Sequence, residues 1–121
     1  MKGQMMRLRV LMVCLGLLGM THSSDVGASW MGGNKLWESC SKAEEEPCLS
    51  GRCINYIRGV TDGIDWSGQS HCLYCIPENA TAGQLKDVVT KWLRDSPQNR
   101  HYEAAGLVAQ TLSEAFPCPP K

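Results

Sequence analysis

Six cysteines spread over residues 40–118 constrain the fold of this 121-residue chain more than any other feature. An even number of cysteines in a small exported chain is typical of a disulfide framework, because a small core gains from covalent support. Zinc ligation by Cys48, Cys53, Cys72 and Cys75, or a redox role for the last two, are the alternatives. We expect structural disulfides, with no metal and no cofactor. The six residues are Cys40, Cys48, Cys53, Cys72, Cys75 and Cys118.

The seventh cysteine, Cys14, lies in a segment with the features of a signal peptide. Three basic residues precede an apolar stretch at residues 10–20, and small residues follow that stretch. We therefore expect residues 1–23 to be a signal peptide and residues 24–121 to form a single mature domain.

Removal of the leader changes the charge of the protein. Three of the 12 basic residues but none of the 12 acidic residues lie in it, so the mature domain has a formal net charge of −3. A mildly acidic domain without a polybasic patch is a poor partner for nucleic acid. No apolar run reaches the roughly 18 residues that a membrane span requires. We expect neither nucleic-acid binding nor a membrane span.

Apolar periodicity in the first half of the mature domain predicts two helices. Asn34 is placed to cap a short first helix that carries Cys40. Residues 49–65 then carry apolar side chains at spacings of three and four, which is one stripe of a helix. Gly59 lies inside this segment, where a glycine costs about 1 kcal/mol relative to alanine. Its presence suggests that another helix approaches closely there.

Two further helices are predicted in the second half, which gives an all-α fold, a small disulfide-stapled bundle of about four helices. Thr81 and Gln84 have the spacing of a capping box, and Trp92 lies on the apolar stripe that follows. Ser96 and Pro97 are expected to begin the fourth helix. Its predicted inner face consists of Ala104, Ala105, Val108, Leu112, Ala115 and Phe116.

This helix order ranks the disulfide pairings. In an antiparallel helical hairpin, the end of the first helix meets the start of the second, and each of these ends carries a cysteine. One cysteine also precedes the third helix, and another follows the fourth. Six cysteines allow 15 pairings, and those ranked first are Cys40–Cys53 and Cys75–Cys118, with Cys48–Cys72 left by elimination as the weakest.

No catalytic arrangement is evident in the mature domain. His71 and His101 lie in no known metal spacing, and paired cysteines leave no nucleophilic thiol. Asp62 and Asp65 are three residues apart on one predicted helix, a spacing more typical of a solvated face than of a catalytic pair. The residues indicate a binding protein, not an enzyme.

An ordered set of motifs over residues 33–118 resembles the Rap/Tai family of type VI secretion immunity proteins. The motifs open with Asn34-x-Leu36 and Cys40, continue with CINYIRGVTD at residues 53–62 and end with AFPC at residues 115–118. This chain departs from the family pattern of four cysteines, because Cys48 and Cys72 are additional. The signature residues expected to serve the fold are Tyr56, Gly59, Asp62, Gln84, Trp92 and Phe116.

The resemblance implies a non-enzymatic periplasmic protein that binds a peptidoglycan-cleaving amidase toxin and covers its active-site cleft. It leaves open whether the protein is a homodimer. A small acid-activated periplasmic chaperone, or a small hydrolase using Asp62 or His71, are the alternative functions. Exposed loops are the usual place for such contacts, and the segment between the second and third helices is the best candidate. The predicted toxin-contact residues there are Asp65, Trp66, His71, Leu73, Tyr74 and Glu78.

Overall fold

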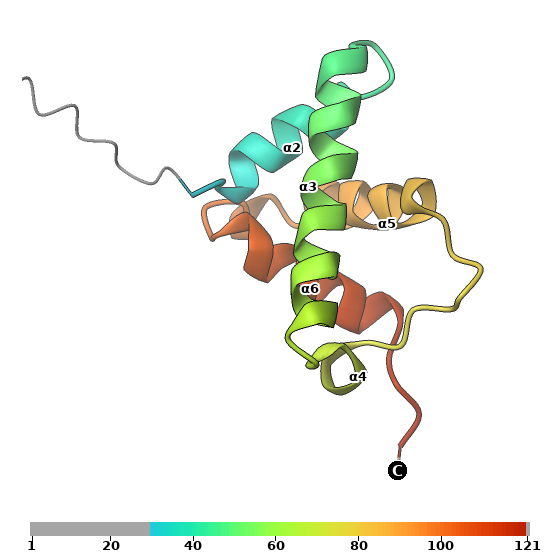
Figure 1. The fold of residues 1–121 in the computed structure, drawn as a ribbon. Helices are drawn as coiled ribbons and strands as arrows, with labels where there is room; N and C mark the ends of the chain where they lie inside the picture. The colour runs from blue at the N-terminus through green and yellow to red at the C-terminus, as the bar shows by residue number, and fades with distance from the viewer. Residues whose placement is uncertain (1–29, 121) are drawn as a thin grey trace, which may run out of the picture.

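The computed structural model describes residues 30–120, so the expected signal peptide lies outside the described residues. These residues form an all-helical domain without strands, which confirms the predicted fold class. Figure 1 shows the long helix α3 running along the molecule, with α2 beside its first half and α4 at its far end. The elements are α2 (Gly33–Ser41), α3 (Pro47–Trp66), α4 (Ser70–Leu73), α5 (Ala82–Asp95), the 3₁₀ turn η1 (Pro97–Asn99) and α6 (Ala104–Ala115).

The core is built from one apolar stripe on each of the four longer helices. Helix α5 buries Leu85, Val89 and Leu93, which are four residues apart and therefore share one face. Helix α3 packs against α2, α5 and α6, so its stripe is covered along most of its length. The largest side chains that are completely buried are Leu36, Ile57, Leu93, Leu112, Val89 and Val108.

The capping box at the start of α5 is confirmed. The backbone N–H of Gln84 donates to Thr81 Oγ1 at 3.2 Å, and the backbone N–H of Thr81 donates to Gln84 Oε1 at 2.7 Å. Two N–H groups that the first helical turn cannot satisfy are thereby paired. The capping box begins the helix one turn before Leu85, the first buried residue of its apolar stripe.

The starts of α2 and α6 differ from the prediction. Asn34 lies inside the first turn of α2, and the capping position is Gly32, which makes no side-chain cap. Pro97 begins only the short turn η1, and α6 starts at Ala104. Ala105 and Ala115 lie on the exposed side of α6, away from the buried stripe of Ala104, Leu107, Val108, Thr111 and Leu112, so their predicted inner positions are wrong.

A short backbone pairing explains both starts. The N–H of Gly33 donates to the carbonyl of Tyr102 at 2.9 Å, and the N–H of Ala104 donates to the carbonyl of Met31 at 2.9 Å. This pairing holds the chain before α2 against the chain before α6. The segment before α6 is therefore extended where the sequence pattern predicted helix, and α2 begins at Gly33, before the predicted cap.

The glycine of close approach is Gly33 and not Gly59. A Cβ on Gly33 would lie 2.8 Å from the carbonyl oxygen of Arg100 and would overlap Leu107 Cδ1. Gly59 is exposed, and a Cβ there would meet nothing within 4 Å. The predicted role of Gly59 in helix packing is therefore wrong.

Two disulfides join the helix ends as predicted. Cys40 at the end of α2 is bonded to Cys53 in α3, with 5.0 Å between their Cα atoms. Cys75 before α5 is bonded to Cys118 after α6, with 4.8 Å between their Cα atoms. The second bridge fastens the segment that follows α4 to the end of the chain.

The third predicted bridge is wrong, because Cys48 is an exposed free cysteine. Cys48 lies in the first turn of α3, whereas Cys72 lies in α4, beyond the other end of that 20-residue helix. A helix of this length spans about 30 Å, far more than the 7 Å that a disulfide can bridge. Elimination failed because it assumed that every cysteine pairs within the chain.

Replacing Trp92 with alanine should lower the free energy of unfolding by about 2 kcal/mol. Trp92 packs against the core but is only partly buried, and its Nε1 donates to Glu114 Oε2 at 2.8 Å. The loss should therefore be smaller than for a fully buried tryptophan. Urea unfolding would measure the loss of stability, with Trp66→Ala as the exposed control. Equal unfolding midpoints for the two variants would contradict the packing of Trp92 against the core.

Candidate functional site

The described residues offer surfaces and not a metal centre as the candidate site. No group of three or more His, Cys, Asp or Glu side chains within residues 30–120 is placed to hold a metal ion. In the same part of the chain, no helix is both long and apolar enough to cross a membrane. The candidate surface is the exposed region between α3 and α5.

The chain turns sharply after α3 and exposes two large apolar side chains. Gly68 has a φ of 71°, a left-handed conformation that favours glycine, and it directs the chain from α3 into α4. Trp66, the last residue of α3, is 93% exposed, and Leu73, the last residue of α4, is 39% exposed. Large apolar side chains that stay exposed are candidates for contact with a partner protein.

We name this region the α3–α5 face. Five of the six predicted contact residues are exposed in this part of the chain, and three of them, Asp65, His71 and Glu78, line one groove. The Cys75–Cys118 bridge anchors the segment beside it. The face consists of Asp65, Trp66, His71, Leu73 and Glu78.

The sixth predicted contact residue, Tyr74, belongs to the core. Its side chain is 4% exposed and lies in the main hydrophobic cluster. Tyr74 has extended backbone angles after α4, and the next residue, Cys75, donates its N–H to the carbonyl of Phe116 at 2.8 Å. The chain is thereby held against the end of α6, with the ring turned inward. Tyr74 cannot be the exposed anchor that the sequence suggested.

A groove of about 500 Å³ lies beside these residues, and we name it the acidic groove. Asp65 from α3 and Glu78 from the segment before α5 are the carboxylates in its wall. Neither carboxylate forms an ion pair with a side chain among the described residues. The other lining residues are Thr61, Ser70, His71, Tyr74, Cys75, Ile76, Pro77, Ala80 and Leu85.

The hydroxyl of Tyr74 is the most unusual polar group of the acidic groove. It is buried and has no hydrogen-bond partner among the described residues. Burial raises the pKa of Tyr74, and the negative charges of Asp65 and Asp62 raise it further. An unpaired buried hydroxyl costs stability, so its retention needs an explanation.

Stability should fall as the pH rises above about 10. Burial and the nearby carboxylates raise the pKa of Tyr74, so the folded state holds this proton more tightly than the unfolded state does. The stability that this proton contributes is therefore fully present below the pKa that Tyr74 has in the unfolded chain. It is lost as the pH rises through the pKa that Tyr74 has in the folded protein. Urea unfolding between about pH 8 and pH 11 should show a shallower loss for Tyr74→Phe than for the exposed control Tyr102→Phe. If the two variants lost stability equally steeply with rising pH, the raised pKa of Tyr74 would be contradicted.

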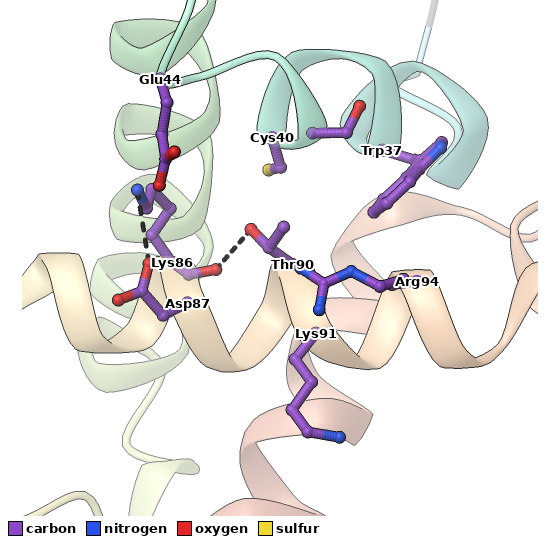
Figure 2. Close-up of a pocket in the computed structure, with 9 residues that line it drawn as sticks. Trp37, Cys40, Glu44, Lys86, Asp87, Thr90, Lys91 and Arg94 are labelled. Carbon is purple, nitrogen blue, oxygen red and sulfur yellow. Dashed lines mark hydrogen bonds and ion pairs between the residues drawn. The ribbon is translucent and has the colours of Figure 1, made fainter.

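A second groove, of about 730 Å³, lies between α2 and α5 (Figure 2). Lys86 is ion-paired with Asp87 at 3.3 Å, and Figure 2 shows Glu44 pointing toward the same lysine. Lys91 is paired with Asp95 at 2.6 Å. Exposed pairs of this kind are ordinary features of a solvated surface. The charges of this groove are mostly satisfied within the protein, whereas those of the acidic groove are not.

Sequence reasoning missed the structural role of Arg100. Its Nε donates to the carbonyl of Leu93 at 2.6 Å, and its Nη2 donates to the carbonyl of Arg94 at 3.2 Å. These carbonyls end α5 and have no partner within the helix. The guanidinium also lies 4.1 Å from the centre of the Trp37 ring. A basic residue shortly after a helix end was the available signal.

The signature residues occupy varied positions. Tyr56, Trp92 and Phe116 are partly buried and pack against the core, and Gln84 serves the capping box. Asp62 is exposed on α3, one turn before Asp65. Packing and capping thus account for four of the six residues.

Residues 32–118 match the family model described as Rap1a immunity proteins. The match covers most of the chain and nearly all of the described residues. Comparisons with curated proteins and with solved structures give no match.

Proposed function

Because the chain belongs to the Rap1a immunity protein family, we propose that it neutralises a type VI secretion toxin, a peptidoglycan-cleaving amidase. Inhibition would act by occlusion, with the protein covering the active-site cleft of the toxin. The family match over residues 32–118 is the observation that carries this proposal. Occlusion demands a rigid surface with a few apolar anchors, and it demands no chemistry from the inhibitor.

The α3–α5 face is our proposed contact surface. Trp66 is the most exposed large apolar side chain of the described residues, and tryptophan is enriched among residues that dominate binding energies. It ends a 20-residue helix, and a disulfide fastens the segment beside it. Ordering the surface before binding reduces the entropy lost on association.

The periplasm is our proposed site of action. Peptidoglycan lies outside the cytoplasm, so a protective protein must be exported to meet the toxin. Disulfides form and persist in oxidising compartments such as the periplasm. The Cys40–Cys53 and Cys75–Cys118 bridges suit that environment. A version lacking residues 1–23 should fail to protect cells that receive the toxin in the periplasm.

Replacing Trp66 with alanine should weaken toxin binding by about 2 kcal/mol, or about thirtyfold in Kd. The free energy of unfolding should change by less than about 0.5 kcal/mol, since the side chain is 93% exposed. Calorimetric titration against amidases encoded beside this gene would measure the affinity.

Tyr102→Ala is the matched control for this experiment. Tyr102 is also an exposed aromatic residue, at 56%, but it lies between η1 and α6, outside the α3–α5 face. Its removal should leave the affinity unchanged. Equal losses for the two variants would place the contact surface elsewhere.

A further inference from the structure

We propose that the acidic groove is a socket for a cationic side chain of the partner protein, an arginine above all. The proposal deepens the proposed function and rests on it for the identity of the partner. It assigns the groove a ligand class, a guanidinium group, that the contact surface alone does not define. Three features of the groove support it.

The first feature is unpaired negative charge. Asp65 and Glu78 come from different segments of the chain and line one groove, and neither has a cationic partner among the described residues. Asp62 lies one helical turn from Asp65 on α3 and adds to the negative field. A planar guanidinium can donate to two carboxylates at once, which a compact ammonium group does less well.

The second feature is independent of the carboxylates. The hydroxyl of Tyr74 is buried without a partner in the wall of the groove. A phenol oxygen can accept a hydrogen bond, so a donor entering the groove would satisfy it.

The third feature is the apolar part of the wall. Ile76, Pro77 and Leu85 line the groove together with the two carboxylates. An arginine has an apolar stem and a charged head, and it buries the stem against such surfaces. Trp66 and Leu73, which end the neighbouring helices α3 and α4, are exposed.

A direct test uses N-acetyl-arginine amide as the probe, titrated into the oxidised protein and followed by NMR. Shift changes should gather on residues 61–78 and saturate, and N-acetyl-citrulline amide, which lacks the charge, should cause much smaller changes. Asp65→Asn combined with Glu78→Gln should weaken binding about tenfold or more. Glu45→Gln combined with Glu46→Gln changes the net charge equally at the other end of α3, and should have little effect.

Tyr74→Phe separates binding from folding. It should weaken binding of the arginine probe severalfold while the melting temperature stays equal or rises, because it removes an unpaired buried hydroxyl. Equal shifts from the arginine and citrulline probes would overturn the proposal. So would unchanged binding by the Asp65→Asn, Glu78→Gln variant, provided that its melting temperature matches that of the wild type.

The same double variant distinguishes this proposal from the proposed function. If the wild type inhibits the amidase, the variant should need about tenfold more protein for equal inhibition. Equal potency would reject the socket while the immunity function stands. If the wild type fails to inhibit the amidase, the proposed function fails, and the arginine titration still decides whether the groove binds a cation.

Discussion

Replacing Cys75 and Cys118 together with alanine should lower the free energy of unfolding by about 4 kcal/mol. The two residues are 43 positions apart, so their bond removes much conformational freedom from the unfolded chain. The Cys40–Cys53 bond closes a separation of 13 positions, and its removal should cost about 3 kcal/mol. Urea unfolding of the oxidised proteins, with the slope compared as well as the midpoint, would measure both losses.

Cys48→Ala is the control for these variants, because Cys48 is exposed and unbonded. Its replacement should change stability by less than about 0.5 kcal/mol. A larger loss for the Cys40–Cys53 variant than for the Cys75–Cys118 variant would contradict the loop-closure argument. A large loss for Cys48→Ala would show that its thiol has a partner.

Replacing Tyr74 with alanine should destabilise the protein by about 3 kcal/mol. The ring lies in the main core cluster, and its removal leaves a cavity beside α3 and α5. Tyr74→Phe keeps the ring and should be neutral or slightly stabilising, since the hydroxyl has no partner. Thermal unfolding of the two variants would test this pair of outcomes. Wild-type stability of Tyr74→Ala would mean that the ring is exposed.

The helices with clear local signals could be predicted from the sequence. The stripe of α3 and the capping box of α5 depend on residues three and four positions apart, and such patterns are visible in one chain. The two disulfides follow from them, because helix order determines which ends meet. The starts of α2 and α6 could not be predicted in this way. They depend on a backbone pairing between residues 31–33 and 102–104, which no local pattern records.

The candidate site was predicted only in part for a related reason. The segment after Trp66 has no apolar periodicity, so nothing in the sequence tells which of its side chains turn inward. Leu73 and Tyr74 are neighbours of similar character, yet one is 39% exposed and the other 4%. Cys75 is bonded to Cys118, and its N–H donates to the carbonyl of Phe116 at the end of α6. These two bonds hold Tyr74 turned inward and leave Leu73 exposed. The acidic groove escaped prediction because its two carboxylates are 13 positions apart.

The central claim is that this protein inhibits a peptidoglycan amidase by stoichiometric binding. The most direct measurement is peptidoglycan hydrolysis by an amidase encoded beside this gene, titrated with the purified, oxidised protein. We expect activity to fall in proportion to added protein and to reach background near one equivalent, as tight occlusion requires. Undiminished hydrolysis at about tenfold excess of the oxidised protein would contradict the claim.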